Sequence, residues 1–408
     1  MKTSPALQRV EKGSLCSGCG LCAGVSDGAI AMITRAPGYS RPLQTAPIPD
    51  KTEAIIRECC PGLEIARWDE PIFADTTVEP SWGPYRRCLT GFATDPEVRH
   101  RGSSGGAISA LAIHALKSGL VERVLHVAPD PARPTRNLIT ISDTPEDVLA
   151  GSGSRYAASS PLERIEDHLS GGRPTVFIGK PCDVSALRRL ARKDERVDHV
   201  FPIKLSFFCG GLPSHAGADR ITRAMGLDPE RLVHFRYRGE GWPGLTVARD
   251  DQGNSGKMLY EDSWGGHLSK EVQFRCKICP DAVGGTADIA CADAWYGGES
   301  GYPQFEEADG RSLIMSRTAV GDALLDAVVQ AGAMEVSSLP VGEIDLMQPS
   351  QARRKRRVAA RTFAARALAR PVPAMDGLLV GKAATREKIA AQLKEAIGTA
   401  RRIVMKRT

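Results

Sequence analysis

The sequence predicts an α/β fold in which a mainly parallel sheet follows a cysteine-rich segment and precedes a basic helical extension. Apolar runs at residues 121–127, 175–179 and 203–209 are typical of buried strands, and helical patterns at residues 107–119 and 184–193 alternate with them. Strands joined through helices usually pair in parallel and are covered on both faces. A separate stretch of short strands and turns, residues 233–259, predicts an excursion on the substrate side.

Composition divides the 408 residues into four segments. Residues 1–85 are rich in glycine, proline and cysteine and contain one clear helical stretch, residues 51–58. The alternating pattern of strands and helices occupies residues 86–170 and 171–345, and residues 346–408 are strongly basic. A chain of this length is expected to form two or three domains.

The cysteine spacing predicts an iron–sulfur cluster near the N-terminus. Cys16, Cys19 and Cys22 stand three residues apart, and Cys60 precedes a proline. Three thiols at this spacing can wrap one face of a 4Fe-4S cubane, and a distant Cys-Pro supplies the fourth ligand, as in bacterial ferredoxins. Zinc is the alternative, although zinc favours two pairs of ligands and gains little from a third equally spaced thiolate. We therefore expect residues 1–85 to be a ferredoxin-like iron–sulfur segment.

A second set of four cysteines is predicted from the ends of strands. Cys182 and Cys209 each follow a predicted strand, and the carboxyl ends of parallel strands share one edge of a sheet. Cys276 and Cys279 could complete the set from a loop, whereas the alternative for each lone cysteine is an inert buried thiol. Three further cysteines have no assigned partner: Cys59, Cys88 and Cys291. The first of these adjoins Cys60 and could replace it as a ligand.

Two glycine–serine runs predict an anion site. The first stands directly before the helix predicted at residue 107 and consists of Gly102, Ser103, Ser104, Gly105 and Gly106. The second run ends in Ser154, Arg155 and Tyr156. Free amides at a helix N-terminus suit a phosphate or pyrophosphate, whereas the alternative is a tight turn with a serine cap. Two such runs favour a dinucleotide.

Charge is concentrated at the C-terminus. Residues 346–408 carry 16 lysines and arginines and 3 acidic residues, so a chain of net charge +6 has a basic appendage on an acidic body. The appendage contains an arginine-rich run at residues 353–357 and a helical pattern at residues 386–405 with regularly spaced apolar side chains. This helix could pack on the body or bind an anionic membrane surface or an acidic partner. Nucleic acid is disfavoured because no aromatic stacking platform accompanies the arginines.

The sequence also predicts the cellular compartment of the protein. The N-terminal residues lack the apolar core of a secretory signal, and no apolar run approaches the ~20 residues that a membrane span needs. Clustered cysteines in a reducing compartment more often bind metal than form disulfides. We therefore expect a cytoplasmic protein, with attachment of its basic helix to the inner face of the membrane as an alternative location.

These residues resemble the coenzyme F420 hydrogenase/dehydrogenase beta-subunit family. The similarity runs from Cys16 to about Trp295. The shared motifs are Cys16-Ser-Gly-Cys19-Gly-Leu-Cys22, Cys60-Pro-Gly62, Gly102-Ser-Ser-Gly-Gly106, Pro181-Cys182, Phe208-Cys209-Gly-Gly211, Tyr237-Arg-Gly-Glu-Gly-Trp-Pro-Gly244, Cys276-Lys-Ile-Cys-Pro-Asp281, Ala287-Asp288-Ile289 and Asp293-Ala-Trp295. One motif differs: the family usually has Gly-Asp where this chain has Cys291-Ala292-Asp293.

The resemblance implies an oxidoreductase that contains FAD and one or two 4Fe-4S clusters, two being favoured. FAD is expected at the glycine–serine loop and at the segments of Tyr156 and Trp242. Residues 86–170 are then the N-terminal part of a flavin-binding domain, and residues 171–345 a catalytic and iron–sulfur domain. Family members act on coenzyme F420 or, with electrons from ferredoxin, on 7-hydroxymethyl chlorophyll or an 8-vinyl group. Others accompany polysaccharide-synthesis genes. A ferredoxin or another one-electron donor and a reducible organic compound are therefore the expected partners.

Proton delivery and two other functional classes remain open at this point. His267, Asp281 and Asp293 are candidates for proton delivery, although aspartates in loops more often serve as caps or ion-pair partners. One alternative function is a non-catalytic electron-transfer subunit, which would lack a substrate pocket. The other is a zinc-stabilised binding protein that uses its basic tail.

Overall fold

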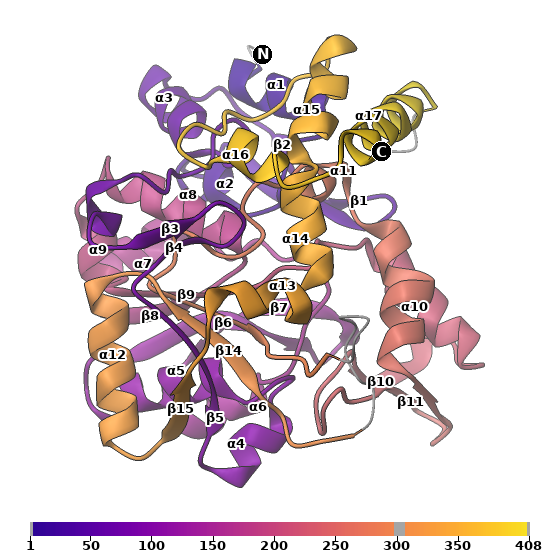
Figure 1. Ribbon diagram of the computed structural model, residues 1–408. Helices are drawn as coiled ribbons and strands as arrows, with labels where there is room; N and C mark the ends of the chain where they lie inside the picture. The colour runs from indigo at the N-terminus through magenta and orange to yellow at the C-terminus, as the bar shows by residue number, and fades with distance from the viewer. Residues whose placement is uncertain (1–2, 298–306, 406–408) are drawn as a thin grey trace.

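A mixed sheet of eight strands forms the centre of the molecule (Figure 1). The computed structural model describes residues 3–297 and 307–405. The strands, in spatial order, are β15 (Met334–Ser338), β5 (Arg87–Ala93), β14 (Ser312–Ser316), β13 (Ile289–Asp293), β9 (Ile203–Phe207), β8 (Thr175–Ile178), β6 (Arg123–Asp130) and β7 (Arg133–Ser142). Neighbours β13, β9, β8 and β6 pair in parallel, and the remaining pairs are antiparallel. The α/β class is confirmed, but only the centre of the sheet is parallel.

Predicted strands and helices lie close to their expected places. The three apolar runs form β6, β8 and β9, and the helical patterns form α5 (Ala107–Lys117) and α8 (Pro181–Ala191). Helix α8 begins three residues earlier than predicted. Pro181 occupies its first turn, where a proline loses no hydrogen bond, and the Asp183 carboxylate accepts from the backbone N–H of Lys180. Cys182 therefore lies in the first turn of a helix that follows the carboxyl end of a strand.

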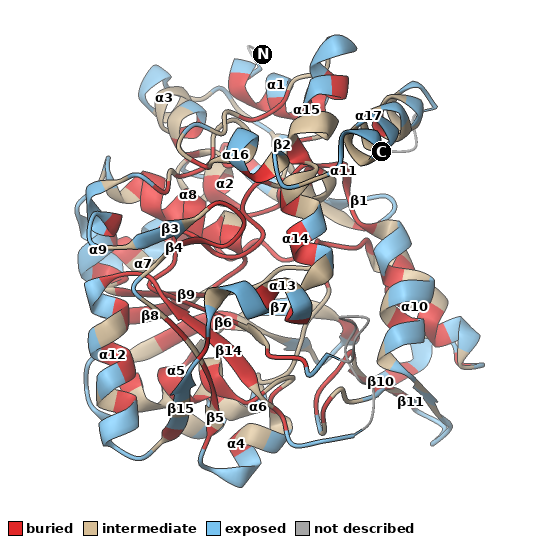
Figure 2. Cartoon of the chain, in the orientation of Figure 1, coloured by how far each residue is buried: buried red, intermediate tan, exposed pale blue. Residues whose placement is uncertain are grey.

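Helices cover both faces of the sheet, and the core lies between these layers (Figure 2). One face is covered by α4 (Pro96–Arg101), α5, α6 (Pro145–Ala150) and α12 (Ala319–Gln330). The other face is covered by α7 (Ile165–Gly171), α8, α9 (Arg196–Val200) and parts of the N-terminal segment. The sheet takes strands from residues 86–170 and from residues 171–345 alike.

The N-terminal segment is more regular than its composition predicts. Its elements are α1 (Pro5–Gly13), α2 (Leu21–Gly24), the hairpin β1 (Ile30–Arg35) and β2 (Tyr39–Gln44), α3 (Asp50–Cys59), η1 (Pro71–Phe73), β3 (Thr77–Glu79) and β4 (Gly83–Tyr85). Helix α1 is missing from the sequence-based expectation, although Ser4 caps it by accepting from the Leu7 amide and Pro5 follows. The segment packs on α8 through α3 and contributes Cys59 to the core on that face.

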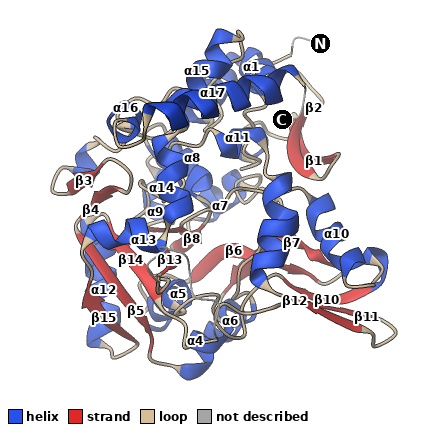
Figure 3. Ribbon diagram, turned by 45° about the vertical axis from the view of Figure 1, so that its right-hand side comes forward, coloured by secondary structure: helices blue, strands red, loops and turns tan. Residues whose placement is uncertain are grey.

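The predicted excursion forms a small antiparallel sheet beside the main one (Figure 3). It consists of β10 (Leu232–Arg236), β11 (Thr246–Asp250) and β12 (Ser255–Met258), preceded by α10 (His215–Ala224) and η2 (Pro229–Arg231). The π-helical turn η3 (Asp262–His267), η4 (Leu268–Glu271) and α11 (Phe274–Lys277) return the chain to the cysteine loop.

The basic tail packs on the body, which was one of the alternatives for its helix, and it is not a separate appendage. After η5 (Val341–Glu343) the chain enters α13 (Ile344–Met347), in which the tail begins, and the other elements of the tail are α14 (Pro349–Arg356), α15 (Val358–Ala367), α16 (Val380–Ala384) and α17 (Ile389–Val404). Ile344, Met347 and Ala352 pack in a buried cluster with Trp68 and Trp82 of the N-terminal segment. Most of the arginine-rich run is also engaged in hydrogen bonds: Arg354, Lys355, Arg356 and Arg357 all have partners. In the described residues, no helix is long and apolar enough to cross a membrane.

One of the shared motifs has a structural role at the centre of the sheet. The buried Asp288 carboxylate accepts from Arg188 (2.7 Å), from the Lys204 amide (2.7 Å) and from the Thr318 hydroxyl (2.6 Å). Burial raises the pKa of Asp288, but Arg188 and these donors together hold it below its usual range. The motif around Asp288 thus joins α8, β9 and the start of α12.

Gly105 is required for packing between strands and the first glycine–serine loop. Its amide donates to Ser312 Oγ (2.9 Å), and its carbonyl accepts from the Ala93 amide (2.7 Å). A Cβ at this position would lie 2.7 Å from the Gly91 carbonyl oxygen and 2.8 Å from the Ser312 nitrogen. Backbone atoms cannot move away cheaply, so the absence of a side chain lets the loop lie against β5 and β14.

Replacing Gly105 with alanine should therefore lower the free energy of unfolding by about 1–3 kcal/mol through overpacking. Urea unfolding followed by circular dichroism measures the change. Gly381→Ala in α16 is the matched control, because a Cβ there meets open space and alanine favours the helix. Equal stability of Gly105→Ala and the parent chain would contradict the packing role.

Candidate functional site

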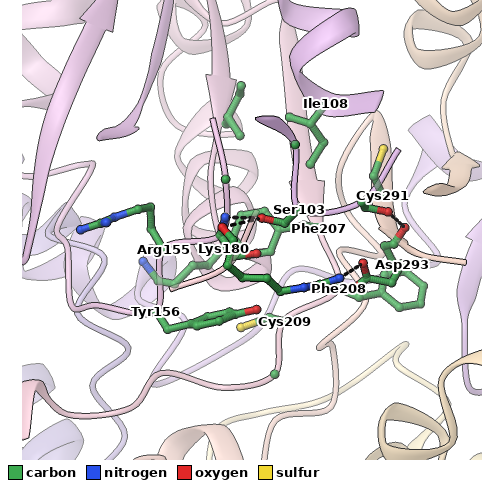
Figure 4. Close-up of a pocket in the computed structure, with 18 of the residues that line it drawn as sticks. Ser103, Ile108, Arg155, Tyr156, Lys180, Phe207, Phe208, Cys209, Cys291 and Asp293 are labelled. Carbon is green, nitrogen blue, oxygen red and sulfur yellow. Dashed lines mark hydrogen bonds and ion pairs between the residues drawn. The ribbon is translucent and has the colours of Figure 1, made fainter. Parts of the chain in front are cut away.

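A cavity of about 580 Å³ lies at the carboxyl ends of the central strands (Figure 4). Ile178 at the end of β8, Phe207 at the end of β9 and Asp293 at the end of β13 line it. Its volume is within the range of ~300–1,000 Å³ that small-molecule and cofactor sites usually have. The predicted ligand crevice therefore exists where the strand ends converge.

The first glycine–serine loop brings a helix N-terminus to the cavity. Ala107, Ile108 and Ser109, the first residues of α5, line the wall together with Gly102, Ser103, Ser104 and Gly106. Amides in the first turn of a helix have no partner within that helix, and they carry the positive end of its dipole. Gly105 is absent from this wall because it faces the strands. The arrangement provides an anion site at the start of α5.

The second glycine–serine run meets the first one. The Ser154 amide donates to Ser103 Oγ (2.5 Å), and Ser154, Arg155 and Tyr156 all line the cavity. The Arg155 guanidinium is occupied by Asn137 Oδ1 (3.0 Å) and by backbone carbonyls. Arg155 therefore fixes the loop to β7, while the Tyr156 ring packs against Trp264 with centroids 4.8 Å apart.

Asp293 is held in an ion pair at the cavity wall, next to the first glycine–serine loop, whose Ser104 hydroxyl donates to the Ala292 carbonyl. Arg238 donates to both of its oxygens, at 2.8 and 2.7 Å, and Trp242 Nε1 donates at 3.2 Å. Trp242 does not line the cavity: it stacks behind Trp295, which does, with centroids 4.7 Å apart. These contacts give Asp293 a positioning role for the aromatic wall.

The other two candidates for proton delivery lie away from the cavity wall. Asp281 is buried and accepts from the backbone amides of Val283 (3.3 Å) and Gly285 (2.8 Å), which is a loop-capping arrangement. His267 ends the turn η3, and burial together with Arg220 lowers its pKa. Neither residue is among those that line the cavity.

The four N-terminal cysteines of the predicted set lie together. Burial raises the pKa of Cys60 to about 12, with a further contribution from Cys16. Burial raises the pKa of Cys19 and Cys22 even more, and both feel the charges of the other members of the set. Cys59 has no cysteine among the groups that shift its pKa. Cys60, unlike its neighbour, therefore interacts electrostatically with another member of this set.

The second set comes from the first turn of α8, the loop after β9, and α11 with the loop that follows it. Burial, then Cys276, raises the pKa of Cys209 to about 12, and burial is also the main cause of the raised pKa of Cys182. The raised pKa of Cys279 has burial as its main cause too, and Cys276 adds to it. Cys209 lines the cavity (Figure 4). The second set is thus adjacent to the glycine–serine loops.

Backbone amides donate to the sulfurs of both sets. The Gly18 amide lies 3.4 Å from Cys16 Sγ, and the Gly211 and Leu212 amides lie 3.4 and 3.3 Å from Cys209 Sγ and Cys276 Sγ. Such donors favour the thiolate form and tune the reduction potential of iron–sulfur clusters.

Charged side chains connect the two sets. Lys180 and Asp183 form a buried ion pair (2.7 Å), and this pair lies in the electrostatic field of both Cys19 and Cys182. Arg275 is buried next to Cys279 and donates to the Pro61 carbonyl (2.9 Å), directly after Cys60. The two sets are therefore neighbours, bridged by residues that no sequence motif singles out.

The basic tail completes the surroundings of the second set, which the sequence analysis missed. Arg354 donates to the carbonyls of Cys209 (2.8 Å) and Gly210, and Lys355 donates to the Pro280 carbonyl (2.6 Å). Gln351 and Arg354 also line the cavity. The arginine-rich run was the available signal, but charge alone did not show that it faces inward.

The residues present fit the expected cofactors. Each set has four thiols and amide donors, and cations accompany the second set, so thiolates there would be compensated. Two buried oxygens at the cavity wall, Asp183 Oδ1 and Gln351 Oε1, have no hydrogen-bond partner within the described part of the chain. In the same residues, no group of three or more histidine, cysteine or acidic side chains is arranged around one point for a single ion. A cubane binds each thiolate through a different iron, so its ligands need not converge in that way.

Comparisons with known proteins agree with this arrangement. Residues 88–166 match the family model of the N-terminal part of the coenzyme F420 hydrogenase/dehydrogenase beta subunit, and residues 173–341 match the model of its C-terminus. Coenzyme F420 hydrogenase subunit beta of Methanococcus voltae is 27% identical over 304 residues, which cover 72% of this chain and 99% of that protein.

Two further similarities extend the comparison. The chloroplastic 7-hydroxymethyl chlorophyll a reductase of Oryza sativa subsp. japonica is 23% identical over 60% of this chain and 49% of that protein. A chain in the F420-reducing nickel–iron hydrogenase complex of Methanosarcina barkeri has the same fold, with a TM-score of 0.53 and 22% identity over 70% of this chain and 96% of that one. Two consecutive family models over the cavity and the second cysteine set, with relatives that are oxidoreductases, show that the chain belongs to the coenzyme F420 hydrogenase/dehydrogenase beta-subunit family.

Proposed function

We propose that this chain is an iron–sulfur flavoprotein oxidoreductase that transfers electrons between a one-electron carrier such as ferredoxin and an organic substrate. Coenzyme F420 or another reducible ring compound is the proposed substrate. The observation that carries the proposal is that Cys209 belongs to a set of four cysteines and also lines the cavity between the two glycine–serine loops. The same wall can therefore serve a cluster on one side and a flavin on the other.

The cofactors have separate sites in this proposal. Cys16, Cys19, Cys22 and Cys60 hold one 4Fe-4S cluster, and Cys182, Cys209, Cys276 and Cys279 hold a second. A flavin can exchange a hydride with a substrate and can also pass electrons singly, whereas 4Fe-4S clusters carry one electron at a time. FAD would therefore connect the clusters to the substrate. The amides at the start of α5 bind its pyrophosphate, and Ser103 keeps the two loops together through the Ser154 amide.

The cavity favours an enzyme over a purely electron-carrying subunit. A carrier without chemistry of its own needs no cavity of about 580 Å³ with an aromatic wall. The ion pair between Arg238 and Asp293 orients Trp295 at that wall, since Arg238 lies 4.7 Å from its ring centroid. Relatives named as beta subunits support a redox protein as partner. We further propose that the chain acts in the cytoplasm and that the substrate enters beside Tyr156 and Trp295.

Replacing either Cys19 or Cys209 with serine should remove one cluster, which is about four of about eight irons per chain, because a cubane needs four thiolates. Iron, sulfide and zinc are measured after anaerobic purification. The matched control is Cys59→Ser, which removes a thiol next to Cys60 that lies outside both sets and should leave the iron content unchanged. Zinc in place of iron, or unchanged iron in Cys209→Ser, would refute the assignment.

Glutamate at Ser109 should remove FAD and leave the iron content intact. Ser109 is the third residue of α5 and lines the cavity, so a carboxylate there occupies the amides that the pyrophosphate needs. Acidic side chains favour a helix N-terminus, so the fold should tolerate the change. Flavin absorbance per chain is the readout, and turnover with coenzyme F420 should fall at least tenfold with the flavin.

Ser109→Gln controls for side-chain size without the charge, and it should retain most of the flavin. Full flavin occupancy in Ser109→Glu would mean that the pyrophosphate binds elsewhere. A protein with full flavin and iron but no turnover with coenzyme F420 would retain the cofactor assignment and exclude that substrate.

A further inference from the structure

Helix α17 exposes a continuous apolar stripe. Ile389, Leu393, Ile397 and Val404 are 78, 60, 70 and 70% exposed. They recur at intervals that place them on one side of a helix, over a length of about 22 Å at 1.5 Å per residue. Phe363 of the neighbouring helix α15 is 69% exposed and enlarges the apolar surface. Isolated exposed apolar residues are ordinary, but a stripe along a whole helix marks an interaction surface.

The orientation of α17 is fixed by its opposite face. Gln392 donates to the carbonyls of Arg356 (2.9 Å) and Ala384 (3.1 Å), and Glu395 accepts from Arg361 (2.8 Å). Thr399 is buried, and Ile403 packs against the same buried cluster as Cys16 and Cys60. Rotation to bury the apolar stripe would break all of these contacts. Figure 2 accordingly shows the outer side of α17 as exposed.

The stripe is bordered by cations that have no internal partner. Lys388, Lys394 and Arg401 of α17 and Arg366 of α15 are exposed, and none makes a hydrogen bond or ion pair within residues 307–405 or with residues 3–297. The two acidic residues of the region are neutralised by neighbours: Glu387 by Arg357 and Glu395 by Arg361. The surface around the apolar stripe is therefore positively charged.

We propose that α17 binds an anionic lipid bilayer, with its axis parallel to the membrane and its apolar stripe inserted among the headgroups. An amphipathic helix with basic residues beside an apolar face is the arrangement that binds such interfaces. A second copy of this chain fits the surface less well, because a two-fold axis would bring the same cations together. Helix α17 lies outside the segments that match the family models, which cover residues 88–166 and 173–341.

Docking through α17 would also orient the redox sites. Ile403, Cys16 and Cys60 all pack against one buried cluster, and α17, α15 and α1 lie on the same side of the molecule (Figure 1). The N-terminal cysteine set would therefore be close to the membrane, and the cavity would remain accessible from the opposite side. This orientation is independent of which substrate the cavity takes.

Flotation of the full-length protein with lipid vesicles tests the proposal. We expect binding to vesicles of phosphatidylcholine and phosphatidylglycerol, at least tenfold weaker binding to pure phosphatidylcholine, and loss of binding at high salt. The double variant Leu393→Glu with Ile397→Glu should reduce binding at least tenfold. The triple variant Lys388→Gln, Lys394→Gln and Arg401→Gln should do the same and should lower the salt dependence.

The matched control is Leu120→Glu, which places the same charge at a side chain that is 51% exposed in the loop after α5. It should bind vesicles like the parent chain. Absence of binding to anionic vesicles, or equal binding to neutral ones, would overturn the proposal. Conversion of a dimer to a monomer by the double variant, measured by analytical ultracentrifugation without lipid, would also overturn it in favour of a second copy.

Discussion

The presence of eight buried or partly buried thiols in two adjacent sets is the constraint on which the surrounding structure depends. A thiolate in a low-dielectric interior is costly, and thiolates near one another repel, so burial and mutual repulsion raise the pKa of most of these cysteines. The fold offsets that cost with backbone amides that donate to sulfur and with buried cations such as Arg275. Helix starts serve the same purpose: Cys182 lies in the first turn of α8, where the helix dipole favours negative charge. Elements α8, α11 and the loop after β9 therefore each contribute a thiol of the second set.

The C-terminal tail lies outside the segments that match the family models, and it too places cations beside the second set. Arg354 and Lys355 donate to carbonyls beside the second set, and α14 contributes Gln351 to the cavity wall. Lys355 also lies 3.9 Å from the ring centroid of Trp68, which fixes the tail against the N-terminal segment. A count of charges predicts a basic tail of this kind on the surface. Its inward orientation follows from Met347 and Ala352, whose burial against Trp68 the linear sequence does not reveal.

The residue patterns predicted the grouping of the cysteines, which depends on local spacing, and missed features that depend on which strands pair. The cysteine spacing and the strand ends led to both sets, because thiol spacing and the shared edge of parallel strands are local rules. No strand was predicted at β5, β14 or β15, so the antiparallel part of the sheet was missed. The residue pattern of a strand does not identify the strand with which it pairs. The role of Gly105 was missed for a related reason. In a glycine run, only contacts with Gly91 and Ser312 distinguish the residue that packs on strands from those that face the cavity.

Three buried charged side chains, Arg275, Lys180 and Asp183, lie between the two cysteine sets and interact with both of them. Arg275 interacts with Cys279 and with the carbonyl next to Cys60, and the pair of Lys180 and Asp183 lies in the field of both sets. Coulomb interactions at such positions are weakly screened because the groups are buried, so a negative charge added to one set is felt by the other. The fixed cations reduce this repulsion without moving, which keeps the reorganisation around each set small. Arg275, Lys180 and Asp183 thus form a fixed charged arrangement beside both cysteine sets, although none of the three belongs to either set.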